Sequence, residues 1–167
     1  MMPRFAFLLL AAATLLPAQL KVAIINSQLA VVETSEIKKA QADMEARFKP
    51  RSGDIEKIQR EMADLQSQIQ TGAGKITQQQ EQNLQAQGQR RQRELTRLTE
   101  DLQADVDRER NDILGRVGGR MQEIVKKLAE ERGLDMVVDV TNTVYFKPAM
   151  EITKEATAAY DKAFPVK

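Results

Sequence analysis

The sequence contains no cysteine, histidine or tryptophan, and only five phenylalanines and two tyrosines. Without cysteine there are no disulfides, thiolate metal ligands or thiol nucleophiles. Without histidine the most frequent general base and transition-metal ligand are missing. Carboxylates are plentiful, but they alternate with bases along helical patterns, and we find no glycine-rich phosphate loop or metal-spaced cluster. We therefore expect neither an enzyme nor a bound cofactor or metal, and the few aromatic residues leave little material for a compact core.

A strong net charge is also missing. Lysine and arginine number 25, and aspartate and glutamate number 24. A protein that binds nucleic acid through bulk charge needs an excess of bases. We therefore expect no nucleic-acid partner.

The N-terminal segment has the pattern of a secretory signal peptide. Arg4 precedes an apolar run of 12 residues, from Phe5 to Leu16. A membrane-spanning helix needs roughly 20 apolar residues, so this run is too short to span a bilayer but fits the apolar region of a signal peptide. We assign residues 1–19 to the signal peptide, with cleavage near Ala18, and expect export.

A long helical region, residues 35–132, follows a short run of β-forming residues at 21–25. Its first arm carries apolar residues at spacings of three, four and seven, which indicate a single stripe along one helix face. These are Ile37, Met44, Phe48, Ile55, Ile58, Met62, Leu65 and Ile69. Met44, Phe48 and Met62 could instead form an adaptable client-binding surface, but their regular spacing favours the seam between the arms. Pro50 predicts a kink or short break.

The second arm repeats its apolar residues every 11 positions. One series is Leu84, Leu95, Val106, Val117 and Leu128, and a second is Leu102, Ile113 and Ile124. An 11-residue repeat gives a nearly straight helix pair. Glycines at 72 and 74 break the pattern between the arms. We therefore predict an antiparallel, coiled-coil-like helical hairpin with its tip near residues 71–76. Gly115, Gly118 and Gly119 mark either a hinge or tolerated exposed positions.

Three short strands are predicted, near residues 21–25, 134–140 and 144–147. So small a sheet is marginal by itself and exposes unpaired edges. Joining copies edge to edge removes those edges. We therefore expect oligomerisation through a β-rich body, residues 20–34 and 133–167, and the mainly α, α+β class. The candidate interface residues are Val22, Ile24, Val137, Val138, Val144 and Phe146. We expect Thr153 to cap the last helix.

Both ends of the mature chain resemble the OmpH/Skp family of periplasmic chaperones. The similarity lies in KVAIIN at residues 21–26, GLDMVVDVTNTVYF at 133–146 and EIT at 151–153. The resemblance implies a periplasmic homotrimer shaped like a jellyfish, with three helical tentacles around a cavity. It also implies ATP-independent holding of unfolded outer-membrane proteins, which prevents their aggregation. The alternative is a structural spacer or tether of the cell envelope. Known members are strongly basic, so a role in lipopolysaccharide binding is not carried over to this neutral chain.

The hairpin tip is locally basic. Residues 66–93 contain four bases and a single acid, Glu81. The bases are Lys75, Arg90, Arg91 and Arg93. The functional interpretation is a tip that attracts acidic client segments or an anionic membrane surface. The alternative is an ordinary solvated helix face. The same region is rich in glutamine, a good helix former, so we predict a polar helical tip.

Overall fold

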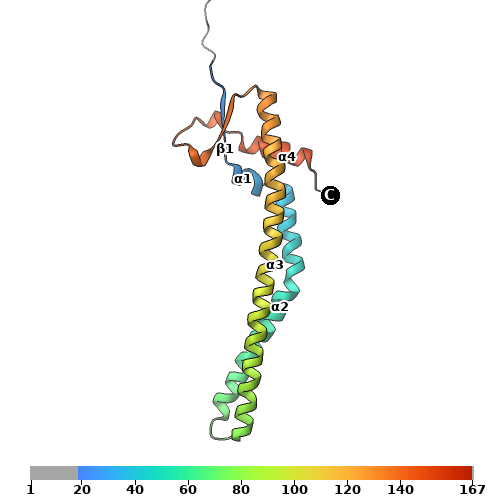
Figure 1. Ribbon diagram of the computed structural model, residues 1–167, viewed down its shortest axis with the longest axis vertical. Helices are drawn as coiled ribbons and strands as arrows, with labels where there is room; N and C mark the ends of the chain where they lie inside the picture. Colours follow the sequence, from blue (N-terminus) through green and yellow to red (C-terminus); the bar gives the residue numbers. More distant parts are fainter. Residues whose placement is uncertain (1–18, 167) are drawn as a thin grey trace, which may run out of the picture.

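The computed structural model describes residues 19–166, so the predicted signal peptide lies outside the described residues except for its last position. A long helical hairpin hangs from a small body that contains the sheet and the C-terminal helix (Figure 1). In chain order the elements are β1 (Val22–Ile25), α1 (Ser27–Val32), α2 (Ser35–Gly72), α3 (Gln78–Arg132), β2 (Met136–Asp139), the 3₁₀ turns η1 (Val140–Asn142) and η2 (Pro148–Met150), and α4 (Thr153–Ala163). Among the described residues, no helix is both long and apolar enough to cross a membrane.

A capping box at the start of α3 and a left-handed glycine shape the hairpin turn. The side chain of Thr77 accepts a hydrogen bond from the Gln80 N–H at 3.2 Å, and the Gln80 side chain accepts one from the Thr77 N–H at 2.8 Å. This reciprocal pair satisfies two N–H groups that the start of α3 would otherwise leave unpaired. Gly74 has a φ of +77°, which residues with a side chain rarely adopt. The turn therefore reverses the chain between Gly72 and Gln78.

Every apolar residue predicted to line the seam is buried or half-buried, which confirms the predicted face of each arm. The depth of burial differs along the hairpin. Near the body Val117 is fully buried and Leu128 is 7% exposed, whereas Leu84 and Leu95 near the tip are only half-buried. Met121, which lies outside the predicted repeat, is also buried. α3 is therefore deeply buried where it passes the body and only half-buried towards the tip.

Ion pairs join the two arms, and the arm that carries the acid changes twice along the hairpin. Near the body and near the tip the acid is on α2 and the base on α3, and between them the arrangement is opposite. The pairs are Glu36–Arg116, Arg47–Glu109, Arg51–Asp105 and Glu61–Arg91. Exposed pairs stabilise a fold little. Sliding one arm along the other would bring like charges together, so the alternation specifies the register of the hairpin.

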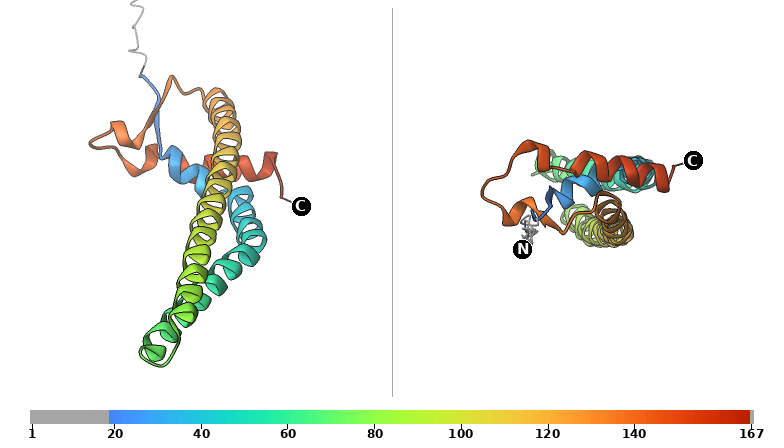
Figure 2. Two further views of the ribbon diagram at one scale, coloured as in Figure 1. Left: turned by 60° about the horizontal axis from the view of Figure 1, so that its bottom comes forward. Right: turned by 90° about the horizontal axis from the view of Figure 1, so that it is seen from above.

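α2 runs through Pro50 as one helix. In its upper half it bows away from α3, and the arms close up again towards the turn (Figure 2). Proline removes one backbone hydrogen bond and crowds the preceding turn, so a bend near this position is expected physically. Of the two predicted outcomes the short break does not occur, and the chain accommodates Pro50 within a curved helix.

The sheet differs from the prediction. β1 and β2 pair in parallel, with Ile24 opposite Val138, and a single bridge joins Ile24 to Glu151. Residues 144–147 do not form a strand, so the third predicted strand is wrong. Asp139 accepts hydrogen bonds from the N–H and hydroxyl of Thr141, which turns the chain out of β2 into η1. A residue with high β-propensity forms a strand only where a partner strand is present. The residues beyond η1 have no such partner within the described chain, so they stay irregular.

The core lies where the body meets the upper end of α3. Tyr160 and Ala156 of α4, Ala30 of α1 and Ile25 of β1 are buried against Met121 and its neighbours on α3. α3 has 55 residues and α2 has 38, so α3 extends beyond the start of α2 into the body. α3 therefore runs from the core of the body to the tip.

Candidate functional site

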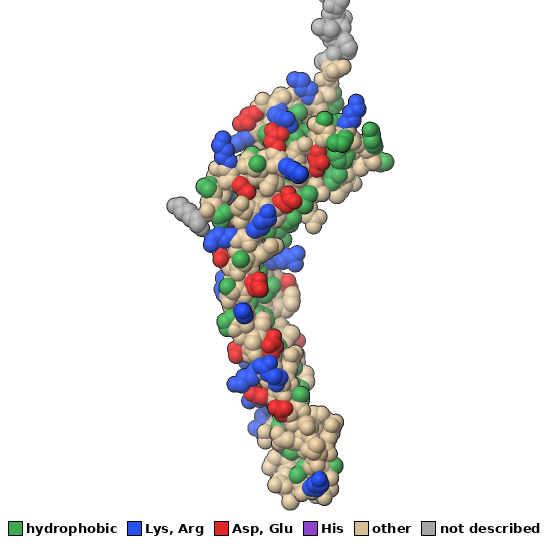
Figure 3. Space-filling view, turned by 180° about the vertical axis from the view of Figure 1, so that it is seen from behind, with side chains coloured by type: hydrophobic (Ala, Val, Ile, Leu, Met, Phe, Trp, Pro, Cys, Tyr) green, Lys and Arg blue, Asp and Glu red, His purple; other side chains and the backbone are tan. Residues whose placement is uncertain are grey.

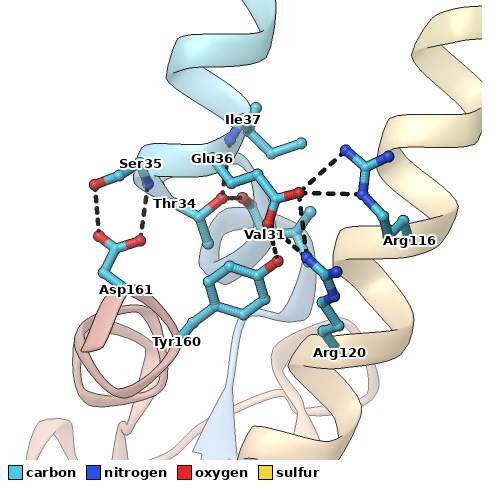
Figure 4. Close-up of polar contacts among 9 residues, drawn as sticks. All are labelled: Val31, Thr34, Ser35, Glu36, Ile37, Arg116, Arg120, Tyr160 and Asp161. Carbon is cyan, nitrogen blue, oxygen red and sulfur yellow. Dashed lines mark hydrogen bonds and ion pairs between the residues drawn. The ribbon is translucent and has the colours of Figure 1, made fainter. Parts of the chain in front are cut away.

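Glu36, in the first turn of α2, is the point at which three helices meet (Figure 4). Its carboxylate accepts a hydrogen bond from the Tyr160 hydroxyl of α4 at 2.6 Å. It also accepts from Arg116 Nε at 3.1 Å and from Arg120 Nη1 at 3.1 and 3.3 Å, both on α3. The Glu36 side chain is 16% exposed. Hydrogen bonds to a partly buried charge are stronger than bonds between neutral groups.

The ionisation of this cluster follows from its contacts. Burial by itself raises the pKa of Glu36, but the hydrogen bonds from Tyr160 and Arg116 and the charges of Arg116 and Arg120 outweigh it, so the pKa is lowered. Burial and the bond to Glu36 raise the pKa of Tyr160 to about 12. At neutral pH the carboxylate is therefore charged and the phenol remains a donor.

A second contact ties α4 to the start of α2. The Asp161 carboxylate accepts from the Ser35 N–H and from the Ser35 hydroxyl, both at 2.9 Å. Thr34, fully buried, supplies the N-cap oxygen for the Ile37 N–H at 3.3 Å. The first N–H groups of α2 are thus satisfied partly by its own cap and partly by a residue far along the chain.

Thr153 does not cap α4 as predicted, because Ile152 occupies the cap position and makes no side-chain cap bond. The Thr153 hydroxyl instead accepts from the Asn26 N–H at 2.9 Å and lies 3.0 Å from a carboxylate oxygen of Glu151, to which it donates. The residue therefore connects α4 to the end of β1.

A groove of about 700 Å³ lies between α1, α2 and α3, directly below this junction. Its walls are mainly apolar and include Val32, Met44 and Leu114. Gly118 borders it, and a Cβ added there would meet nothing within 4 Å. Gly118 thus leaves space beside the groove that no side chain fills.

The predicted interface residues fall into three groups. Ile24 is 3% exposed and already covered within the single chain. Val144 is fully exposed, beside Tyr145, which is 80% exposed. Half-buried positions are Val22, Val137, Val138 and Phe146. Apolar side chains gather on the projecting end of the body (Figure 3).

The predicted tip residues are not equivalent. Lys75, Arg90 and Arg93 are exposed. Arg91 is half-buried and pairs with Glu61 of α2 at 2.9 Å and with Glu94 at 2.6 Å. Charges of both signs alternate along the arms, while uncharged side chains cover most of the tip (Figure 3). Arg91 is therefore part of the hairpin's own ion pairs, whereas the other three are available to solvent.

Sequence reasoning missed Glu36, Tyr160 and Asp161. The only local signal is the order Thr34, Ser35, Glu36, which reads as an ordinary helix start with an acid in the first turn. Among the described residues, no group of three or more histidine, cysteine or acidic side chains is arranged to hold a metal ion.

Comparison with known proteins matches this architecture. A model of the OmpH-like outer membrane protein family matches residues 21–160. A "Skp-like protein" of Pseudomonas aeruginosa is 23% identical over 138 residues, which are 83% of this chain and 82% of that protein. The crystal structure of a putative OmpH-like outer membrane chaperone from Caulobacter crescentus superimposes with a TM-score of 0.71 at 18% identity, covering 90% of this chain and 89% of that one. Because the family match includes the sheet, both arms and most of α4, this protein belongs to the OmpH/Skp family, to which both ends of its sequence are similar.

Proposed function

We propose that this protein is an ATP-independent holdase of the periplasm, which binds unfolded outer-membrane proteins and prevents their aggregation. Its family includes an OmpH-like chaperone of the same fold, which supports a chaperone role. The observation that carries the finer proposal is the incomplete body. Among the described residues β2 has a strand partner on one side only, and Val144, further along the chain, is fully exposed.

The proposal requires several copies. A two-stranded sheet with an open edge is marginal by itself, and a projecting apolar side chain gains free energy when a neighbour covers it. A heterologous contact repeated around a closed ring satisfies every edge equally. We infer a homotrimer in which Val22, Val137, Val138, Val144 and Phe146 contact neighbouring subunits. Ile24 supports them from within the subunit.

In such a ring the hairpins would extend in the same direction and surround a common space. Client segments would be held there by many weak contacts with the arms and by confinement. The exposed bases Lys75, Arg90 and Arg93 give the open end of this space a local positive charge. That charge would attract acidic client segments or an anionic membrane surface, and salt would weaken the attraction.

The holding activity is tested by diluting a urea-unfolded outer-membrane β-barrel into buffer that contains this protein and following light scattering. We expect aggregation to be suppressed near one trimer per client. A Val144→Glu variant places a charge at the proposed subunit contact, so it should lose trimers and suppression together. Scattering unchanged by the wild-type protein would favour a spacer or tether of the envelope, which needs the long arms but no client.

The tip is tested separately with Arg90→Glu combined with Arg93→Glu. Client capture should slow at low salt and converge with the wild-type rate at high salt. The matched control is Lys126→Glu combined with Lys127→Glu, because both lysines are exposed on α3 at the body end, far from the tip. Equal capture rates for both variants would assign the tip bases to solvation alone.

A further inference from the structure

The upper part of α2 is weakly supported by its neighbouring arm. Between Ala40 and Phe48 it borders the apolar groove on one side and a second groove of about 460 Å³ on the other. Gly118 of α3 leaves open space opposite it, and Pro50 follows shortly. A helix segment with few packed contacts and a missing backbone bond opens at low free energy.

Above this segment, hydrogen bonds join the first turn of α2 to α4. The Tyr160 hydroxyl binds Glu36 and the Asp161 carboxylate binds Ser35, so two consecutive residues of α4 hold two consecutive residues of α2. On the other side Arg120 of α3 binds Glu36 and lies over the Phe164 ring, 4.7 Å from its centroid. Phe164 in turn packs against Tyr160, with ring centroids 5.0 Å apart. The C-terminal helix thus holds α2 and α3 together at one point.

The two arms are not equally anchored without this contact. α3 is embedded in the core through Met121, Ile124 and Leu128. α2 joins the body through the short link after α1 and through its first turn, with Ile37 as its one residue in the buried core. Loss of the α4 contact would therefore release α2 while leaving α3 in place.

We propose that Tyr160 and Glu36 are positioning residues, through which α4 fixes the first turns of α2 against α3 and thereby sets the width of the groove below α1. Ile37 and Met44 form the α2 wall of that groove. The groove lies at the body end of the arms, where the proposed cavity would be. Any effect of the groove width on client binding therefore rests on the proposed holding function. The positioning of α2 by α4 is a property of the single chain and does not depend on clients.

Hydrogen exchange followed by mass spectrometry on the full chain tests the proposal without any client. Tyr160→Phe keeps the ring and removes the donor. A hydrogen bond to a charged group contributes about 1.5–3 kcal/mol, so amides of residues 37–48 should exchange at least about tenfold faster. Exchange in residues 121–128 should stay the same. Tyr145→Phe makes the same chemical change at the chain's other tyrosine, which is exposed, and should leave both segments unaltered.

A second measurement covers the case in which Tyr160→Phe fails to fold. Glu36→Gln keeps the side-chain shape and removes the charge, and Glu45→Gln is its exposed control. Because the chain contains no cysteine, spin labels at Ala42→Cys and Asn111→Cys report the spacing between the arms alone, when labelled subunits are diluted into unlabelled protein. We expect Glu36→Gln to broaden this distance distribution. An unchanged distribution, or exchange that accelerates equally in residues 37–48 and 121–128, would overturn the positioning role. Neither result depends on whether the protein suppresses aggregation.

Discussion

The gradient of burial along α3 predicts that the same leucine-to-alanine substitution has two different costs at two positions. Leu128 and Leu95 belong to the same 11-residue series, but Leu128 is 7% exposed and Leu95 is half-buried. Replacing a buried leucine by alanine removes its transfer free energy and leaves a cavity, for a loss of roughly 2–5 kcal/mol. A half-buried leucine loses about half of the 1.5–3 kcal/mol of full burial, and the loose seam leaves little cavity. We expect about 3 kcal/mol for Leu128→Ala and about 1 kcal/mol for Leu95→Ala.

The assay is urea unfolding followed by circular dichroism, at one protein concentration because the proposed subunit association would contribute to stability. The urea midpoint of Leu128→Ala should fall about three times as far as that of Leu95→Ala, at an unchanged slope. Hydrogen exchange should place the Leu95→Ala effect in the lower arms. Equal midpoint losses would refute the inference that α3 is packed more tightly in the body than near the tip.

Three further predictions follow from local contacts. Gly133 ends α3 with a φ of +60°, so Gly133→Ala should cost about 1 kcal/mol, measured by the same unfolding assay, and no loss would mean that the strain is relieved elsewhere. Hydrogen bonds from Ser27 and Thr141 hold the pKa of Asp139 well below its usual range. The contribution of the Asp139 carboxylate to stability is therefore present above about pH 4 and is lost as the pH falls further. The Tm difference between wild type and Asp139→Ala should shrink below pH 4. A constant difference would contradict the role of its charge. Arg51→Asp should lower Tm by facing Asp105, and adding Asp105→Arg should restore it if these charges specify register; the double variant staying as low as the single one would contradict this.

The hairpin could be predicted from the sequence because its information is local and periodic. Each arm's stripe repeats over many turns, so the buried faces around Ile58 and Val117 follow from spacing alone. The burial of Met121 was not predicted, because this residue lies one turn beyond Val117 and outside the 11-residue series. Residues of the body bury it.

The body could be predicted only in part. Residues 144–147 have strand-forming side chains, but strand formation depends on a partner that the described chain does not supply. Thr153 has the character of a cap, yet β1 lies close enough to use its hydroxyl. Glu36 gathers donors from residues 80 to 124 positions away, and such convergence cannot be read from neighbours in sequence.

The central claim is that copies of this chain associate through their bodies and hold an unfolded outer-membrane protein between their arms. Native mass spectrometry of the processed protein, mixed with a urea-unfolded outer-membrane β-barrel, tests this most directly. We predict a dominant species with the mass of three subunits and one client, and free trimers when the client is omitted. A spectrum of single subunits, with the client unbound, would contradict the account.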